Sequence, residues 1–339
     1  MTKKSKSIFG ILTESTGLYF SEFDKFIKYM TFPVLGQILG LGLTLVITYF
    51  YSINLPKLID KYPNLNDFWT LMGISVLIAL PGLAIFCKAF WDYLVAYGAI
   101  NSMFINLRKS KKVYDFEAHN ELIKRRSFQF IGLWMLWGIF TIIAVCPLFW
   151  VICGIFAVYF VLTFQVFTFE PELSPFGCIR KSLLLIKGHF TQTFILIILA
   201  GMLTYLLIPQ IIIKAFDCTG INTALASAIM PFINLIPELD FRMYGLGILK
   251  HADYAIITVQ TIIAQILIQY TLPLRSILWS NWYAELNNGI EEHELPKTTK
   301  KSKKRPSEKL MENSKKKFSK KKLDDNILKR AMEKDDEQD

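Results

Sequence analysis

The stretch "RSFQFIGLWMLWGIFTIIAVCPLFWVICGIFAVYFVLTFQVFTFE", residues 126 to 170, decides the fold, because it carries no charge between Arg126 and Glu170. As one helix it would be roughly 65 Å long, twice the thickness of a hydrocarbon core of about 30 Å. Pro147 lies near its middle and removes a backbone donor, which favours a break in a helix. The stretch therefore predicts two membrane-spanning helices, 128–145 and 149–169, folded back on each other.

Four more uncharged stretches run from Lys28 to Lys57, from Asp67 to Lys88, from Lys187 to Lys214 and from Asp253 to Arg275. Each is long enough for a helix that crosses a bilayer, which needs about 20 residues. A soluble helical core would need a polar face on most of these helices, and none has one. We predict an all-α integral membrane protein with six transmembrane helices as three hairpins, at about 30–53, 68–90, 128–145, 149–169, 191–213 and 254–274.

The chain has 339 residues, 53% of them hydrophobic, and a formal net charge of +10. We expect a cytoplasmic N-terminal segment with an amphipathic helix at 1–29, a six-span membrane domain at 30–290 and a tail at 291–339. Within the tail, residues 297–322 carry 13 basic and 2 acidic side chains, and residues 323–339 carry 3 basic and 7 acidic ones. Such a segregated charged composition cannot bury a core and predicts disorder.

The basic residues also predict the orientation in the membrane. With the N-terminus in the cytoplasm, 33 of the 38 Lys and Arg residues fall on the cytoplasmic side of the six spans, and 5 fall outside. Cytoplasmic loops of membrane proteins carry such an excess of basic residues. We therefore expect both termini in the cytoplasm, which agrees with an even number of spans.

One further segment, "CTGINTALASAIMPFINLIP" at 218–237, is also uncharged. Its two prolines and its polar residues leave an apolar stretch of about 15 residues, a length more typical of interfacial or re-entrant segments than of spans. The segment is an interfacial helix in the external loop, a re-entrant segment or a seventh span. A seventh span would place the lysine-rich tail outside, which the charge distribution disfavours.

The segment "FGCIRKSLLLIKGHF", residues 176–190, joins two spans on the predicted cytoplasmic side. Wound as a helix, it has an apolar stripe of Phe176, Ile179, Leu183, Ile186 and Phe190, whose spacings are 3, 4, 3 and 4. We expect this amphipathic connecting helix to lie at the headgroup boundary. The side chains that would contact anionic lipid headgroups there are Arg180, Lys181 and Lys187.

The N-terminal stretch "FGILTESTGLYFSEF", residues 9–23, is similar to this joint. A shift of 167 positions aligns the two with five identities in fifteen residues. Both stretches lead directly into a predicted span on the same side. We interpret them as two copies of an internal repeat.

Polar residues within the spans are amides and hydroxyls. In the last span Thr258, Thr261, Gln265 and Gln269 share one face, and Gln37, Gln165 and Gln210 are possible partners in other spans. This face either makes hydrogen bonds between helices or lines a pore or ligand groove. Gly36 and Gly40 in the first span allow close approach of another backbone, either within the bundle or in a dimer.

The run "PLFWVICGIFAVYFVLTFQVFTFEPELSPFGCIRKSLLLIKGHFTQTFILIIL", residues 147–199, resembles the multi-pass membrane domain that accompanies some bacterial glycerophosphoryl diester phosphodiesterases. It is also similar to related stand-alone inner-membrane proteins without assigned function. Ser182, Lys187, Gly188 and Phe190 approximate the family's motif before a span, with His189 inserted, and "ILTESTGLYFSEFDKF" at 11–26 is similar to its entry helix. The resemblance implies a six-helix fold in a bacterial cytoplasmic membrane and carries no established catalytic residues.

No motif of a hydrolase, a nucleotide-binding loop or a metal site occurs in the sequence, and its five cysteines are single. We predict a non-enzymatic multi-pass membrane protein, without cofactor or metal, that serves membrane organisation or a lipid-associated role. The alternative is a channel or facilitator for an uncharged or lipidic solute. Expected partners are membrane lipids, including anionic inner-leaflet lipid. The tail fixes topology or binds lipid or an acidic protein; nucleic acid is disfavoured, and the oligomeric state stays open.

Overall fold

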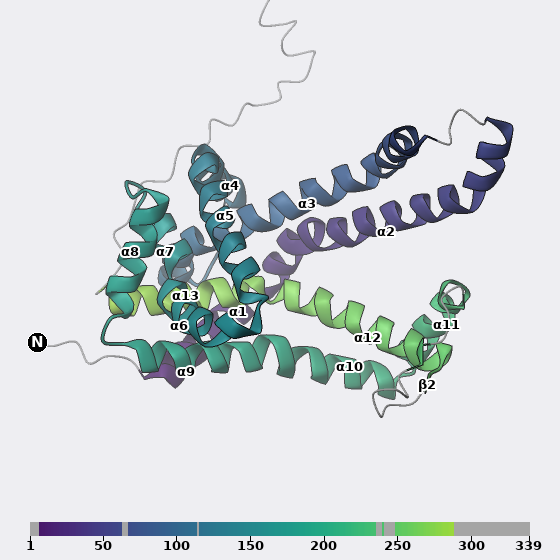
Figure 1. The fold of residues 1–339 in the computed structure, drawn as a ribbon. Helices are drawn as coiled ribbons and strands as arrows, with labels where there is room; N and C mark the ends of the chain where they lie inside the picture. The colour runs from purple at the N-terminus through teal and green to yellow at the C-terminus, as the bar shows by residue number, and fades with distance from the viewer. Residues whose placement is uncertain (1–6, 63–66, 114, 235–238, 241–247, 288–339) are drawn as a thin grey trace, which may run out of the picture. The chain divides into compact units, whose positions relative to one another are not determined.

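The computed structural model describes residues 7–62, 67–113, 115–234, 239–240 and 248–287, all within a compact unit, Met1–Pro296. The tail predicted at 291–339 lies outside the described residues. The first half contains α1 (Ile8–Ser21), α2 (Phe23–Lys61), α3 (Phe68–Ser110), α4 (Phe116–Arg125), α5 (Ser127–Ala144), the 3-10 turn η2 (Pro147–Phe149), α6 (Trp150–Phe160) and α7 (Thr163–Phe169) (Figure 1).

The second half contains α8 (Pro175–Ile186), α9 (Phe190–Gly201), the π-helical segment η3 (Met202–Leu207), α10 (Ile208–Cys218), α11 (Ile221–Ile233), α12 (His251–Tyr270) and α13 (Leu272–Leu286). Two strands of two residues each, β1 (Leu239–Asp240) and β2 (Ile248–Leu249), pair in antiparallel register with Leu239 opposite Leu249.

Six helical segments are long and apolar enough to cross a membrane, which confirms the predicted number of spans and supports an integral membrane protein. They are Phe23–Lys61, Phe68–Ser110, Ser127–Ala144, Pro147–Phe169, Phe190–Cys218 and His251–Leu286. The predicted break in the central stretch is also confirmed, because the chain turns after Ala144 and starts again at Pro147 in η2.

Three helices extend beyond the spans that the sequence predicts for them. The helix expected at 30–53 runs from Phe23 to Lys61, the one expected at 68–90 continues to Ser110, and the one expected at 254–274 continues as α13 to Leu286. These extensions carry charges that hydropathy places outside the membrane. The extensions at 91–110 and in α13 pack into the protein core, whereas residues 54–61 of α2 are exposed or half-buried. As a result Lys88, Asp92 and Arg275 lie inside long helical runs.

The uncharged segment at 218–237 contains α11, a helix of 13 residues. Such a helix is about 20 Å long, shorter than the hydrocarbon core, and therefore cannot cross it alone. It packs against α12 through an apolar cluster that includes Ala226 and Ile233 on α11 and Ala255 and Val259 on α12. α11 is thus tied to the last spanning segment as a short surface or re-entrant helix.

Close approach of α2 and α3 depends on glycine. A Cβ atom on Gly36 would lie 2.8 Å from the Cβ of Ala89, and one on Gly40 would lie 2.8 Å from the carbonyl oxygen of Gly82. Real Cβ atoms essentially never approach other atoms so closely, so larger residues would push the two helices apart. Gly36 and Gly40 therefore pack within the bundle, the first of the two roles that the sequence left open.

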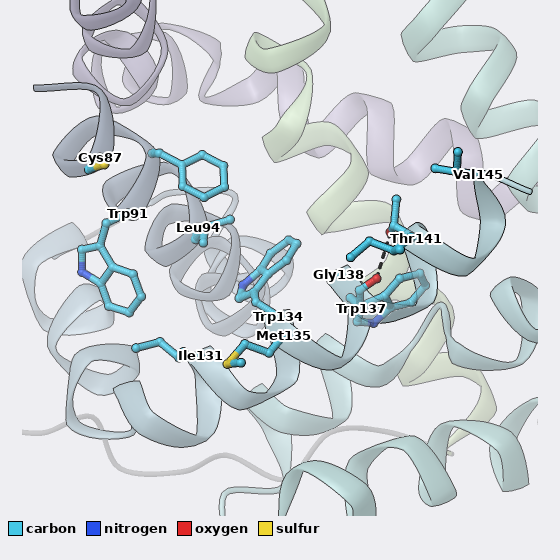
Figure 2. Close-up of a pocket in the computed structure, with 12 residues that line it drawn as sticks. Cys87, Trp91, Leu94, Ile131, Trp134, Met135, Trp137, Gly138, Thr141 and Val145 are labelled. Atoms are coloured by element: carbon cyan, nitrogen blue, oxygen red, sulfur yellow. Dashed lines mark hydrogen bonds between the residues drawn. The ribbon is translucent and has the colours of Figure 1, made fainter. Parts of the chain in front are cut away.

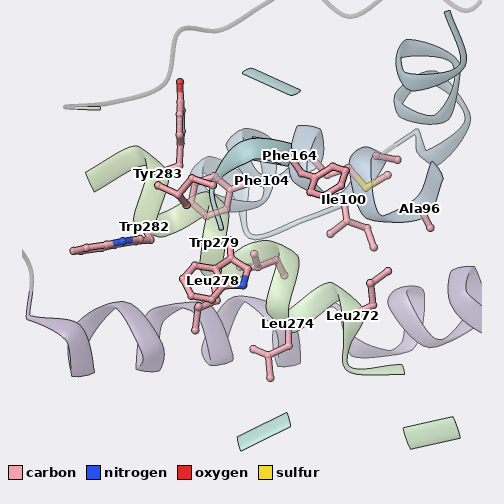
Figure 3. Close-up of a cluster of buried hydrophobic side chains, with 14 of the residues drawn as sticks. Ala96, Ile100, Phe104, Phe164, Leu272, Leu274, Leu278, Trp279, Trp282 and Tyr283 are labelled. Carbon is pink, nitrogen blue, oxygen red and sulfur yellow. The ribbon is translucent and has the colours of Figure 1, made fainter. Parts of the chain in front are cut away.

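The largest buried side chains gather where α3, α7 and α13 meet (Figure 3). Phe104 from α3 and Trp282 and Tyr283 from α13 are almost completely buried there. The short helices α1 and α8 pack against the same core. The core therefore lies at the helix ends that the sequence assigns to the cytoplasmic side.

The two aligned segments, 9–23 and 176–190, bury corresponding positions. Ser7 caps α1 by accepting a hydrogen bond from the backbone N–H of Gly10 at 3.1 Å, and Ser174 caps α8 by accepting one from Gly177 at 3.2 Å. The buried residues Ile11, Ser15 and Tyr19 of α1 correspond, at the shift of 167, to the buried residues Cys178, Ser182 and Ile186 of α8. These matched caps and faces support the repeat.

The predicted apolar stripe of the joint is wrong in detail. α8 ends at Ile186, and Gly188 has a φ of +93°, so Phe190 belongs to α9 rather than to the same helix. Ile186 is buried, whereas Phe176 is 71% exposed. The buried face of α8 carries the small residues Cys178 and Ser182, which permit close packing against the protein core. The face that carries Phe176 remains uncovered.

Candidate binding cavity around Arg275

Arg275 lies at the break between α12 and α13. Pro273 lacks a backbone N–H and occupies the first turn of α13, so the regular hydrogen bonding of α12 stops at Tyr270. The Nη2 of Arg275 donates a hydrogen bond of 2.9 Å to the carbonyl oxygen of Ile268, near the end of α12. The sequence Thr271–Arg275 thus holds the guanidinium close to the break.

Tyr205 is the second anchor of this guanidinium. The Arg275 guanidinium carbon lies 4.9 Å from the centre of the Tyr205 ring, and Nη1 donates a hydrogen bond to the Tyr205 hydroxyl. Tyr205 belongs to the π-helical segment η3. Such segments occur frequently at functional sites, because the extra residue in the turn re-aims its neighbours.

Arg275 and Tyr205 line a cavity of about 430 Å³ whose walls come from α3, α5, α6, α7, α9 and α13 as well as η3. Aromatic side chains dominate the wall, among them Tyr93, Tyr97 and Trp134. Among the described residues, no carboxylate oxygen lies within 4.0 Å of the guanidinium nitrogens of Arg275. The cavity therefore combines an apolar wall with a cation that lacks an internal counterion.

Hydrogen-bond donors at this cavity are incompletely used. The Nε of Arg275 and the indole Nε1 of Trp134 are both buried without a hydrogen-bond partner among the described residues. A buried donor without an acceptor costs roughly 1–3 kcal/mol, and more when it is charged. An anionic ligand in the cavity would balance the charge of Arg275.

A polar network fixes the wall behind Tyr97. Gln165 on α7 donates from Nε2 to the Tyr97 hydroxyl at 3.2 Å and to Asn101 Oδ1 at 3.3 Å. Ser276 and Ser280 on α13 also donate to Asn101 Oδ1, Ser280 at 3.3 Å. Buried networks of this kind hold helices in a fixed arrangement when their bonds are made. Here the network joins α3, α7 and α13 beside Arg275.

The three predicted lipid-contacting cations have different surroundings. Arg180 is exposed on α8, and Lys187 is exposed directly after the end of α8. Lys181 is half-buried, and its Nζ lies 3.5 Å from Glu170 Oε1, an oxygen that also accepts a hydrogen bond of 2.7 Å from the Tyr283 hydroxyl. Lys181 is therefore engaged with the protein, whereas Arg180 shares the uncovered face of α8 with Phe176 and Lys187 is exposed just beyond the helix.

The predicted polar face of the last span lies on α12. Thr261 and Gln265 are exposed, and Thr258 and Gln269 are half-buried. The Thr261 hydroxyl donates to the carbonyl oxygen of Ile257 in its own helix, and the Oε1 of Gln269 is buried without a partner among the described residues. Thr261 thus satisfies its hydroxyl within its own helix.

The three glutamines considered as partners behave differently from one another. Gln37 donates to the carbonyl oxygen of Pro33 in its own helix at 2.7 Å, and Gln210 is exposed. Only Gln165, of these three, makes hydrogen bonds to another helix in the described structure. Of the glutamines considered, Gln165 is therefore the one that links helices, through Tyr97 and Asn101 on α3.

Sequence reasoning missed Arg275 as a site residue. It placed Arg275 just beyond the last span, where a single cation is ordinary. The signal that could have found it is the pattern "TLPLR" at 271–275, in which a proline breaks the helix two residues before an isolated cation. Nothing in the sequence near Tyr205 indicates a partner for that cation.

No family model, no curated protein and no solved structure matched the chain when it was compared with each. In the part of the chain that the structure describes, no three or more His, Cys, Asp or Glu residues are grouped so that they could hold a metal ion.

Proposed function

We propose that this protein is a non-enzymatic multi-pass membrane protein with a lipid-associated role, and that the Arg275 cavity binds the anionic headgroup of a membrane lipid. The observation that carries this proposal is the guanidinium of Arg275, which has no carboxylate partner among the described residues and lines an aromatic cavity. Phosphate and carboxylate groups match the planar N–H pattern of a guanidinium.

The composition of the cavity favours binding over catalysis. Apart from Arg275, its titratable lining residues are tyrosines. General acid–base or nucleophilic chemistry usually uses a histidine, carboxylate, lysine or cysteine within reach of the substrate. The hydroxyls of Tyr93 and Tyr97 are better suited to orient a ligand than to take its protons.

The proposal includes the arrangement of the chain in the membrane. We place both termini in the cytoplasm of a bacterial cytoplasmic membrane, with the spans as three hairpins and with α1 and α8 as cytoplasmic connecting helices. The uncovered face of α8, with Phe176 and Arg180, and the exposed Lys187 directly after it support contact with an anionic inner leaflet. The tail would reinforce this contact.

Thiol labelling tests the orientation. Cys218 is exposed and should react with an impermeant reagent added outside intact cells. Cys178 is a poor internal control, since burial raises the pKa of its thiol to about 11. An Arg180→Cys variant of a protein that otherwise keeps only Cys218 serves instead, because position 180 is exposed. External labelling at position 180 but not at 218 would reverse the topology.

Lipid retention tests the headgroup site. The intact protein is purified in detergent with added phosphatidic acid or phosphatidylcholine, and bound lipid is counted by native mass spectrometry. Arg275→Gln should reduce retained phosphatidic acid about tenfold or more, because a hydrogen bond to a charged group contributes roughly 1.5–3 kcal/mol. Lys88→Gln removes a cation of the same helical domain outside the cavity and should retain the lipid. Equal retention by Arg275→Gln would refute the site.

The second candidate function is a facilitator for an uncharged or lipidic solute. It is favoured by Gln265, exposed on α12, and by the unpartnered Oε1 of Gln269 one turn further on. In reconstituted vesicles, solute flux that disappears in the double variant Gln265→Leu and Gln269→Leu would support it. Flux that is absent from the unaltered protein would remove it.

A further inference from the structure

A second cavity lies between α3 and α5 (Figure 2). Its volume is about 780 Å³, and we call it the α3–α5 groove. Trp91 and Leu94 from α3 and Ile131 and Met135 from α5 surround it. Its one hydroxyl, that of Thr141, donates at 2.8 Å to the carbonyl oxygen of Trp137 in the same helix. The groove therefore offers an almost entirely apolar surface.

The groove adjoins the Arg275 cavity at two tryptophans. Trp134 and Trp137 line both spaces. Trp134 is held by aromatic neighbours, with its ring centre 4.4 Å from that of Phe164 and 6.2 Å from that of Tyr97. Trp134 and Trp137 on α5 thus border both a cavity that contains the Arg275 cation and a groove with an apolar surface.

This juxtaposition identifies the chemistry of the ligand. We infer that the α3–α5 groove holds the acyl chain of the same anionic lipid whose headgroup lies at Arg275, an inference that rests on the function proposed above. An amphiphile matches both halves, because its anionic group needs the guanidinium and its chain gains from apolar contact. A free phosphate would use only the Arg275 cavity and would be indifferent to the groove.

Gly138 provides a variant that fills the groove. It lines the groove on α5, and a Cβ atom built on it meets no other atom within 4 Å. Gly138→Leu therefore adds a side chain next to the groove without a clash at its Cβ, and replaces glycine in a helix by a better helix former. Gly154 on α6 is the matched control, since its Cβ also meets nothing within 4 Å and it lines neither space.

The experiment uses the full chain in detergent with phosphatidic acid that carries a photoreactive group on its acyl chain. After illumination, cross-linked peptides are mapped by mass spectrometry. We expect cross-links to α3 and α5 in the unaltered protein and in Gly154→Leu, and a loss of about tenfold or more in Gly138→Leu. Glycerol phosphate, which has the anionic group but no chain, should compete more weakly than the lipid in the unaltered protein, because it lacks the apolar contact, and should bind Gly138→Leu with unchanged affinity.

The outcomes separate the two proposals. If Gly138→Leu keeps full cross-linking while Arg275→Gln loses lipid, the headgroup site stands and the groove assignment is overturned. If Arg275→Gln keeps full lipid retention, the headgroup site is overturned, and with it the inference. If phosphatidylcholine cross-links to the groove as efficiently as phosphatidic acid, the groove is an ordinary lipid-facing surface and the inference is also overturned.

Discussion

Two charged sites within the long helical runs differ in how their charge is balanced. On α3, Lys88 pairs with Asp92 one turn later, and its Nζ lies 5.8 Å from the centre of the Phe32 ring on α2. At the start of α13, Arg275 contacts the Tyr205 ring and a backbone carbonyl, and no carboxylate among the described residues lies within ion-pair distance of it.

This difference indicates which charge is structural and which is available to a ligand. A charge in or near a bilayer is costly unless it is paired or reaches the interface. Lys88 has a local counterion and is largely exposed, with 61% of its side chain accessible. Among the residues that the structure describes, Arg275 has no carboxylate within ion-pair distance and its Nε has no acceptor, so its environment favours an anion supplied from outside the chain.

The largest effect should come from separating α2 and α3, which removes the surroundings of Lys88. Gly40→Leu places a side chain against the backbone of Gly82 and Phe86, and neither backbone can move without breaking the helix contact. We expect loss of folded protein, measured by yield and by size-exclusion chromatography in detergent. Gly42→Leu is the control, since a Cβ there meets nothing within 4 Å; equal loss in both variants would contradict the close-packing role.

A large but local effect should follow when Arg275 receives a counterion of its own. Tyr205→Glu places a carboxylate next to the guanidinium and makes this site resemble the Lys88–Asp92 pair. The protein should stay folded but lose preference for phosphatidic acid over phosphatidylcholine about tenfold or more, because an internal acceptor competes with the lipid. Tyr205→Gln separates loss of the ring from gain of the charge. Unchanged preference in Tyr205→Glu would contradict an electrostatic role for Arg275.

A moderate effect should appear on acidification, through a buried group outside the spans. His119 on α4 accepts or donates at 2.6 Å to the Ser102 hydroxyl, and burial lowers the pKa of His119 from 6.5 to about 4. Between these two pH values the unfolded chain binds a proton that the folded one does not, so stability falls as the pH drops from 6.5 towards 4. Thermal unfolding at pH 7 and pH 5 should show this loss.

His119→Asn tests the assignment, because it removes the titrating ring and keeps a polar group beside Ser102. The difference between pH 7 and pH 5 should become smaller in this variant. An identical pH dependence in both proteins would show that other groups cause the loss. Binding experiments at low pH can then be corrected for stability before the two charged sites are compared.

The smallest effect should come from Asp92→Asn, which leaves Lys88 without its counterion. An exposed pair at this spacing on a helix contributes about 0.3–0.5 kcal/mol, and Lys88 can reach solvent. Thermal stability should change by little, and lipid selectivity should not change. A new preference for anionic lipid in Asp92→Asn would mean that any unpaired cation in these helices suffices, and would remove the distinction between the two sites.

Much of the fold follows from the sequence alone. Six apolar segments, the break at Pro147 and the packing glycines depend on local composition, and the structure agrees with them. The ends of the helices could not be predicted in the same way. In α3, the charged residues from Lys88 onward end the apolar pattern from which a span is predicted. The helix nevertheless continues, because its other face is buried against α13.

The candidate site was harder to predict, as two predicted residues show. The sequence predicts that Lys181 is free to contact lipid, but its Nζ lies 3.5 Å from Glu170 Oε1. The sequence predicts that Ile186 belongs to an apolar stripe at the headgroup boundary, but Ile186 is completely buried in the protein. Both errors have one cause, because the side of a helix that is buried depends on the neighbours that the fold supplies.

The sequence by itself determined that this chain is built from apolar helices of membrane-spanning length, because the hydrophobic effect depends on how many apolar residues lie between charges. Tertiary structure alone decided that Arg275 meets Tyr205, 70 positions away, and no carboxylate in the described part of the chain. Electrostatic balance is a property of atoms close in space, and residues far apart in the sequence supply those atoms.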